Sequence, residues 1–328
     1  MNYATKIISL LLILSFSSAE IKAENGVEKE ILISCVSNKN AKEFSNYHLK
    51  YDPMMSTNNF TFQNGEIAKL KQLIGENEKI SFFFLGYEDF LRKYSGRSFL
   101  IARENMLNTG ATACTISYDY LCGISLLKKL QYFSAIENRV PKVVAMTSAL
   151  IQNIVDSKEF KINLSDVYLT GFCLGGHIAG NVGSRLKKIY NGQMVPAIWA
   201  FDPPGIGFPY PIEVGQPERV QKGDGKFVVV VHTSSLGVLE NIADVDVIVN
   251  YGRDQPGCEN MFCDHFAAFI LLENILLLND ALPKNQRGFP LAHSYDYASQ
   301  FSFEITNPPS KQSGTYYLRT GKIFGNDK

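Results

Sequence analysis

Three residues of this sequence carry the side chains of a nucleophile, an acid and a base, in that order along the chain: Cys173, Asp202 and His265. Cys173 is the central residue of Gly-Phe-Cys-Leu-Gly, a G-x-C-x-G pentapeptide that begins at residue 171. Glycines at both ends of such a pentapeptide suit a sharp turn from a strand into a helix, because a Cβ there would collide with the neighbouring backbone. The partial positive charge at the start of the helix would favour a thiolate or an oxyanion.

The segments around the pentapeptide have the patterns that this turn requires. Residues 167–170 are apolar or β-branched and predict a buried strand, whereas residues 174–189 have apolar and small residues at helical spacing. Together they predict a nucleophile elbow with Cys173 at its apex. An isolated G-x-C-x-G is equally consistent with a structural turn that holds a buried, inert cysteine. Asp202 follows another apolar run, residues 195–201.

Strand and helix patterns alternate through the middle of the chain. Further strands are expected at residues 31–36, 80–85, 111–118 and 227–232, and helices at 95–106, 141–155 and 266–278. This alternation predicts an α/β fold with a mostly parallel central sheet and helices on both faces. In such sheets, functional groups gather beyond the carboxyl ends of the strands. Cys173 and Asp202 are expected at such ends, and His265 in a later loop.

Composition limits the classes of protein that remain. The 328 residues are 45% hydrophobic, and 32 basic residues balance 32 acidic ones, so the chain lacks the basic excess typical of nucleic-acid binding. Residues 1–23 have the pattern of a secretory signal peptide, with Lys6 before an apolar segment too short to span a bilayer. We expect residues 24–328 to form one secreted domain without a transmembrane segment. Asn59 and Asn163 begin N-glycosylation sequons.

Several blocks resemble, in order, the pancreatic lipase family, which contains secreted lipases, insect phospholipases that release the sn-1 acyl chain, and insect yolk proteins. The blocks are the elbow at 167–180, Trp-Ala-Phe-Asp-Pro-Pro-Gly at 199–205, Val-Val-Val-His-Thr at 229–233, the loop-rich segment 244–258, Cys-Asp-His at 263–265 and a closing strand at 314–320. Together they are far more specific than any one of them. The similarity covers roughly residues 82–325.

The resemblance implies an α/β-hydrolase that acts on acyl esters of lipids, such as the sn-1 ester of phospholipids, without a cofactor or a metal. It assigns Cys173 to the nucleophile position, where the family usually has serine, Asp202 to the acid and His265 to the base. Asp224 and Asp264 are weaker alternatives for the acid. By resemblance, the backbone N–H groups of Tyr87 and Leu174 form the oxyanion hole. We expect structural roles for the remaining histidines, which are His48, His177, His232 and His293.

The chain also departs from the family pattern. Leu85 stands where the family has a histidine before the glycine, and four residues separate Cys258 from Cys263, where triglyceride lipases have a long lid. Too few residues follow His265 for the family's C-terminal β-sandwich domain. We expect a disulfide between Cys258 and Cys263. A second one, from Cys35 to Cys122, would tie the N-terminal strand to the sheet and leave Cys114 buried.

The sequence is therefore consistent with two functions. The first is a secreted carboxylic-ester hydrolase with a Cys-Asp-His triad, whose partner is a lipid or ester substrate and which contacts lipid only peripherally. The second is a lipase-fold lipid-binding, yolk or reproductive-fluid protein with little or no turnover. Intact Asp202 and His265 favour the first function, since a site without catalytic demand could lose them. Cys173 and Leu85 favour the second, because both replace family residues at the site.

Overall fold

The computed structural model describes residues 30–87, 90–118, 132–208, 218–280, 289–295, 301–303, 306 and 312–321. The expected signal peptide, residues 1–23, and Cys122 lie outside these ranges. The strands are β1 (Glu30–Ser37), β2 (Asn40–Lys50), β3 (Ile80–Phe84), β4 (Thr112–Ser117), β5 (Val167–Phe172), β6 (Ala197–Phe201), β7 (Val228–His232), β8 (Val245–Val249), β9 (Phe289–Leu291), β10 (Phe301–Phe303) and β11 (Gly314–Leu318). The helices are α2 (Asn64–Ile74), α3 (Phe90–Thr109), α4 (Tyr132–Asn138), α5 (Val140–Asp156), α6 (Leu174–Ile189) and α7 (Met261–Asp280), with short 3-10 turns at η1 (Pro53–Ser56), η4 (Leu164–Asp166) and η5 (Asn250–Gly252).

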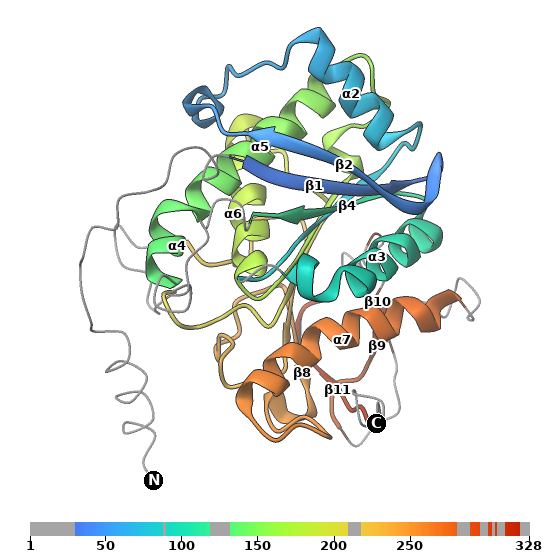
Figure 1. The fold of residues 1–328 in the computed structure, drawn as a ribbon. Coiled ribbons are helices and arrows are strands. Elements are labelled where there is room, and N and C mark those ends of the chain that lie inside the picture. The colour runs from blue at the N-terminus through green and yellow to red at the C-terminus, as the bar shows by residue number, and fades with distance from the viewer. Residues whose placement is uncertain are drawn as a thin grey trace.

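A nine-stranded sheet forms the centre of the described molecule, in the order β11-β8-β7-β6-β5-β3-β4-β1-β2 (Figure 1). Neighbouring strands from β4 to β11 are parallel, whereas β1 is antiparallel to β4 and to β2. All residues of β3 are buried between two parallel neighbours, as its continuous apolar run predicts. This mostly parallel sheet with helices on both faces confirms the expected α/β-hydrolase fold class.

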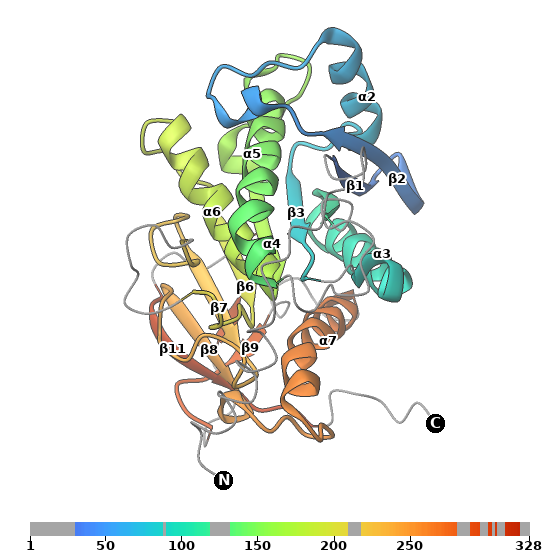
Figure 2. The same cartoon turned by 60° about the vertical axis from the view of Figure 1, so that its left-hand side comes forward.

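Helices cover both faces of the sheet. α5 and α6 pack together on one face, and α3 and α7 pack together on the other (Figure 2). Glu273 interrupts the apolar pattern of α7, yet it is buried and forms an ion pair with Arg97 of α3. A buried carboxylate without a partner would strongly destabilise the fold, so this ion pair accounts for a charged residue at the contact between the two helices.

Successive side chains of β3 enter two separate hydrophobic cores, because side chains alternate across a sheet. Phe82 and Phe84 of β3 join the core beneath α5 and α6, whereas Phe83 joins the core beneath α7. Cys173 packs against both cores, because it lies where β5 turns into α6. The elbow is therefore held from both sides of the sheet.

Six of the helices and strands are not predicted by the sequence pattern: α2, α4, β2, β8, β9 and β10. β2 is an edge strand in which Leu49 is the one buried residue, so it lacks an alternating apolar pattern. β8 contains Asp246, whose carboxylate is buried and bonds to His232. Asp246 lowers the hydropathy of this short segment, so the hydropathy pattern does not predict a strand. Hydropathy does not register that His232 pairs with the carboxylate.

The cysteine pairing differs from the expected one. Cys35 is bonded to Cys114 and not to Cys122, so the predicted Cys35–Cys122 disulfide is wrong. The register of β1 against β4 puts Cys35 directly opposite Cys114, with their Cα atoms 4.0 Å apart. The sequence does not tell which strand lies beside β1, and that neighbour decides the partner. The other disulfide joins Cys258 to Cys263.

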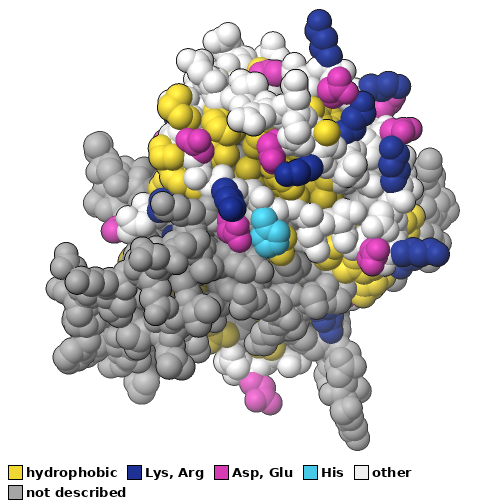
Figure 3. Space-filling model, turned by 45° about the horizontal axis from the view of Figure 1, so that its top comes forward, with side chains coloured by type: hydrophobic (Ala, Val, Ile, Leu, Met, Phe, Trp, Pro, Cys, Tyr) yellow, Lys and Arg dark blue, Asp and Glu magenta, His cyan; other side chains and the backbone are white. Residues whose placement is uncertain are grey.

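The described surface carries charges of both signs. Figure 3 shows basic and acidic side chains interspersed on the face that it brings forward, in keeping with their equal numbers in the chain. Asn59 and Asn163 are both exposed, so both sequons are accessible to a glycosyltransferase. None of the described helices combines the length and the apolar character needed to cross a membrane.

Candidate active site

The turn between β5 and α6 is the tightest approach of strand and helix backbones at the site. A Cβ on Gly171 would lie 2.0 Å from the carbonyl oxygen of Gly175, and a Cβ on Gly175 would lie 2.1 Å from that of Phe84. Both positions therefore require glycine, for the steric reason expected from the sequence. Between them, Cys173 has φ 55° and ψ −131°, a conformation that non-glycine residues rarely adopt.

Cys173 is the unpaired cysteine of the described residues and is partly exposed. Its own N–H is bonded to the carbonyl of Phe201 at 3.0 Å, which ties the elbow to the end of β6. The thiol interacts with the ring of His265, because its charge is a cause of the raised pKa of that imidazole. The cysteine therefore has both the access and the partner that a nucleophile needs.

Asp202 follows β6 directly and is completely buried, with φ 47°. Its carboxylate accepts hydrogen bonds from the backbone N–H groups of Thr233 at 2.8 Å and Ser234 at 3.1 Å, and from the Ser234 hydroxyl. The remaining bond comes from Nδ1 of His265, 2.7 Å from Oδ2. These donors fix the carboxylate, and the carboxylate in turn fixes the orientation of the imidazole.

His265 lies in the second turn of α7, and the expectation that it occupies a loop is therefore wrong. The reason is at the start of the helix, where the Asn260 side chain accepts the N–H groups of Phe262 and Cys263, both at 3.1 Å, and so caps α7 earlier than hydropathy suggests. The imidazole is nearly buried, and its ring centroid lies 4.9 Å from that of Phe172. A ring held in this way has little freedom to leave the site.

The electrostatics of His265 favour its protonated form. Burial alone would lower the pKa of His265, but the charge of Cys173, hydrogen bonds to Asp202 and Cys173, and the charge of Asp202 together raise it to about 10. An imidazolium between a carboxylate and a thiolate is the arrangement that these contributions describe.

The two alternative acids bond elsewhere. One oxygen of Asp224 accepts the N–H of Gln221 at 2.8 Å, and burial raises the pKa of Asp224 to about 7. Asp264 accepts the N–H of Gln255 at 2.6 Å, and burial again raises its pKa. Among the described residues, the carboxylate bonded to His265 is that of Asp202.

The expected oxyanion donors lie at the same edge of the sheet as Cys173. Leu174 is the first residue of α6, so its N–H has no acceptor within the helix. Tyr87 follows the end of β3, the strand that pairs with β5 through Phe84 and Gly171. The ring of Tyr87 packs edge-to-face on that of Tyr132 of α4, with centroids 5.4 Å apart. Burial, followed by the charge of Cys173, raises the pKa of Tyr132.

The other histidines have structural surroundings. His177 bonds through Nε2 to the carbonyl of Pro204 at 2.8 Å, accepts the N–H of Val220 at Nδ1, and stacks on Phe208. Complete burial lowers the pKa of His177 to about 3, so the ring stays neutral. His48 lies at the surface beside Glu30, and the ring of His293 packs on that of Tyr316.

His232 forms a second buried histidine–aspartate pair at the end of β7. Its Nε2 lies 2.8 Å from Oδ1 of Asp246, and its Nδ1 lies 2.9 Å from the carbonyl of Val238. The next two residues in the chain donate the N–H groups that hold Asp202. The His232 pair therefore braces the segment that positions the acid.

The supporting residues around Asp202 were not found from the sequence. Thr233 and Ser234 could have been expected, because β7 is the strand after β6 and their carboxyl ends are adjacent. Gln255, which donates to the carbonyls of Thr233 and Val249, both at 2.9 Å, gives no such signal. Its role depends on the path of a loop that has no regular pattern.

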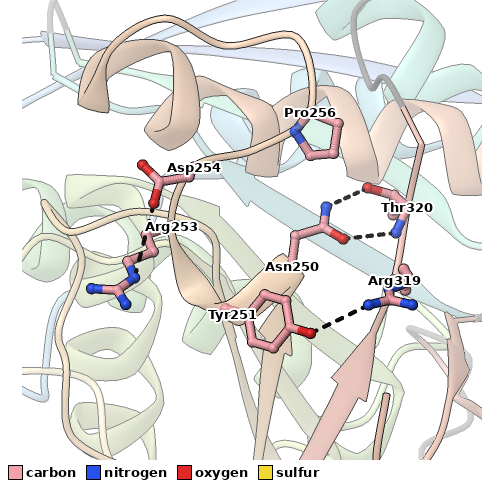
Figure 4. A pocket seen from close by; sticks show the side chains of 7 residues that line it. All are labelled: Asn250, Tyr251, Arg253, Asp254, Pro256, Arg319 and Thr320. Carbon is pink, nitrogen blue, oxygen red and sulfur yellow. Dashed lines mark hydrogen bonds and ion pairs between the residues drawn. The ribbon is translucent and has the colours of Figure 1, made fainter. Parts of the chain in front are cut away.

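A cavity of about 400 Å³ lies between η5, the loop after it and the end of β11 (Figure 4). Its polar groups are largely bonded to each other: Asn250 bonds to Thr320, and Arg319 donates to the Tyr251 hydroxyl. The side chains of Arg253 and Arg319 lie on opposite sides of Figure 4, so the two arginines do not converge on one ligand. The cavity joins the ends of two strands and includes none of the three residues of the cysteine site.

A model of the Lipase family matches residues 77–273, more than half of the chain. The chain belongs to the lipase family. The matched range contains the elbow, Asp202 and His265, so the family match covers all three residues of the site. It also confirms the resemblance found in the sequence blocks.

Curated relatives in the lipase family are phospholipases. "Phospholipase A1 member A" of Bos taurus is 30% identical over 208 residues, which are 60% of this chain and 41% of the relative. "Phospholipase A1 4" of Polistes dominula is 34% identical over 143 residues, 42% of each chain. "Phospholipase A1" of Polybia paulista is 33% identical over 181 residues, 52% of this chain and 51% of the relative. The chain thus spans about half the length of these relatives, or less.

Solved structures with a similar fold include esterases. Carboxyl esterase 2 of Tuber melanosporum is 11% identical, with 84% of this chain and 83% of that chain covered and a TM-score of 0.33. The metagenomic carboxylesterase EstE1 is 9% identical, with 75% and 71% covered and a TM-score of 0.32. At these TM-scores, membership of the lipase family rests on the sequence match.

Proposed function

We propose that this protein is a secreted hydrolase of lipid acyl esters, with Cys173 as nucleophile, His265 as acid and base, and Asp202 as the residue that orients His265. The observation that carries the proposal is a single imidazole that is bonded to a buried carboxylate and interacts with the thiol at the elbow. A buried, bonded carboxylate and a partly exposed thiol on the two sides of one ring are the parts of a nucleophilic triad.

In the first half-reaction, the Cys173 thiolate attacks the acyl carbonyl and forms a tetrahedral intermediate. In this proposal the N–H groups of Leu174 and Tyr87 receive its oxyanion, and the start of α6 adds partial positive charge there. The carbon–oxygen bond to the alcohol then breaks, and His265 gives its proton to the departing alkoxide. The products are a free alcohol, a thioester on Cys173 and a neutral His265.

In the second half-reaction, neutral His265 takes a proton from water while the water oxygen attacks the thioester. The carbon–sulfur bond breaks, the carboxylic acid leaves, and the thiolate and the imidazolium form again. The acylated sulfur carries no charge, so one contribution that raises the pKa of His265 is lost in the acyl-enzyme. The same histidine can therefore be an acid in the first step and a base in the second.

We propose phospholipids as the substrates, because three of the relatives are named phospholipase A1. Secretion is supported by the pattern of residues 1–23, by the two disulfides of the described chain and by the exposed sequons. The disulfides would be rare in a reducing compartment. Phospholipid substrates and secretion are therefore both parts of the proposal for this protein.

Mass spectrometry of the intact protein after incubation with an activated acyl ester tests the proposal. We expect one acyl group on Cys173, which then disappears as water hydrolyses the thioester. Cys173→Ala is the matched control and should remain unmodified. A wild-type protein that neither carries an acyl group nor releases the carboxylic acid faster than Cys173→Ala, under conditions that preserve the fold, would refute the hydrolase and favour the lipid-binding alternative.

A further inference from the structure

We propose that the site discriminates by the leaving atom of its substrate and is better matched to acyl thioesters than to oxygen esters. This inference rests on the proposed role of Cys173 as the nucleophile and names the substrate class of that site. The probes are small acyl thioesters, and the natural class is lipid acyl groups attached to sulfur. The leaving groups of the intermediate and the acids around the thiol decide this preference.

The tetrahedral intermediate has two groups that it can expel. With an oxygen ester, these are the Cys173 thiolate and an alkoxide, and a thiolate is by far the better leaving group, since a thiol has a pKa of about 8.5 and an alcohol is much less acidic. The intermediate therefore returns to the thiolate and the ester unless the alkoxide is protonated as it leaves. With a thioester, both groups are thiolates, so the intermediate proceeds and returns at comparable rates.

The described groups near Cys173 are poor donors of the proton that an alkoxide requires. The charge of Cys173 acts on Tyr132, and burial, followed by the charges of Cys173 and Tyr87, raises the pKa of Tyr132 well above its ordinary value. Its hydroxyl is also occupied by the carbonyl of Ile206 at 3.2 Å. His265 is the donor in the proposed mechanism, and its bond to the buried carboxylate of Asp202 favours retention of its proton even after the sulfur has lost its charge to the acyl carbon.

Hydrolysis of the acyl-enzyme does not meet this obstacle. In that step the attacking group comes from water and the leaving group is the Cys173 thiolate, so the better leaving group departs in the forward direction. Sulfur at the elbow thus hinders acylation by an oxygen ester and assists deacylation. With a thioester substrate, acylation is no longer hindered, and deacylation proceeds as before.

The overall reaction balances without a further reagent. The thiolate of Cys173 bonds to the acyl carbon, the carbon–sulfur bond of the substrate breaks, and the substrate thiol leaves as its thiolate. Water then hydrolyses the thioester on Cys173 with His265 as base, which yields the carboxylic acid and restores the thiolate and the imidazolium. Neither half-reaction includes an oxidation or a reduction.

The test compares two octanoyl substrates that differ in one atom: the octanoyl thioester of 2-mercaptoethanol and the octanoyl ester of ethylene glycol. Release of octanoate gives kcat/KM for each, and the ratio of thioester to ester is measured in the wild type and in Cys173→Ser. We expect this ratio to be at least about tenfold larger in the wild type, because the serine enzyme expels an alkoxide in either direction with the oxygen ester. Cys173→Ala supplies the background rate.

A second measurement keeps the test decisive if Cys173→Ser does not fold. Wild-type kcat/KM for octanoyl esters of increasingly acidic alcohols should rise steeply as the pKa of the alcohol approaches that of cysteine. Equal thioester-to-ester ratios in wild type and Cys173→Ser, or a flat dependence on the alcohol, would overturn the inference and leave the hydrolase intact. Wild-type rates equal to those of Cys173→Ala with every substrate would overturn both the inference and the proposed function.

Discussion

At the scale of single residues, the nucleophile is the position where one atom decides the chemistry. We expect Cys173→Ser to increase the hydrolysis of oxygen esters by about tenfold or more, because serine makes the two leaving groups of the intermediate equivalent. The supporting bonds of Asp202 are independent of this change. Steady-state hydrolysis of a phospholipid and of a short-chain ester, compared with the wild type, measures the effect.

Cys173→Ala is the control for that comparison, since it keeps the elbow and removes the nucleophile. A serine variant that folds like the wild type and remains as inert as the alanine variant would contradict the prediction. The fault would then lie with the oxyanion donors at Tyr87 and Leu174. Circular dichroism of the three proteins establishes that they share one fold.

The charge on His265 is a second property of a single residue that can be measured directly. We expect its imidazole to lose a proton near pH 10 in the wild type and at a clearly lower pH in Cys173→Ser, because the sulfur charge is then absent. Nitrogen NMR of the histidine ring follows the titration, and the neutral His177 provides an internal reference. Identical His265 titrations in both proteins would show that Cys173 does not interact with the ring.

The same shift has a consequence for stability. The pKa of His265 is higher in the folded chain, about 10, than its ordinary value of 6.5, so the folded state holds the proton more tightly. This contribution to stability is complete below about pH 6.5 and is lost as the pH rises through about 10. Chemical unfolding across this interval should show a smaller loss for Cys173→Ser than for the wild type.

At the scale of elements, the elbow depends on glycines that permit the close approach of β5, α6 and β3. We expect Gly171→Ala to lower the free energy of unfolding by about 2–4 kcal/mol, because its Cβ would collide with rigid backbone. Gly65→Ala in α2 is the matched control, since nothing lies within 4 Å of a Cβ there and alanine favours a helix. Urea denaturation compares both variants, and equal midpoints for Gly171→Ala and the wild type would contradict the steric argument.

The elements that the sequence predicts are those whose own residues carry the signal. The elbow helix begins and ends at the predicted residues, 174 and 189, because small and apolar residues repeat along the face that meets the sheet. β2 and β8 give no such signal: β2 lies at an edge with one buried residue, and β8 buries Asp246 against His232. The start of α7 depends on a side-chain cap by Asn260, and the position of His265 on a helix follows from it.

The site shows the same division between local and tertiary information. Cys173 is predictable because the glycines beside it are needed locally, whereas the partner of Cys35 depends on the order of strands in the sheet. The bonds that hold Asp202 come from the neighbouring strand, and Gln255 reaches them from an irregular loop. Residues that act through a neighbour distant in the chain are therefore missed, while residues constrained by their own turn are found.

At the scale of the whole molecule, the loop between Cys258 and Cys263 bears on the substrate surface. A long lid covers the apolar cleft of a lipase in water and opens at an oil interface, which activates such enzymes there. Here the disulfide closes four residues, with Cα atoms of the two cysteines 5.4 Å apart. Asn260 and Met261 within it cap and begin α7, so this loop is engaged in the helix that carries His265.

A loop used in this way cannot fold over Cys173, and we expect the cleft to stay open in water. An open cleft cannot keep a very large apolar patch from water without association, so phospholipids or more soluble esters should be preferred to triglyceride droplets. Hydrolysis by the wild type or by Cys173→Ser should rise smoothly with substrate concentration through the point where an interface forms. The measurement is a titration with a short-chain phospholipid across its micelle concentration, beside a triglyceride emulsion. A sharp jump at that concentration, with triglyceride strongly preferred, would mean that another segment acts as a lid.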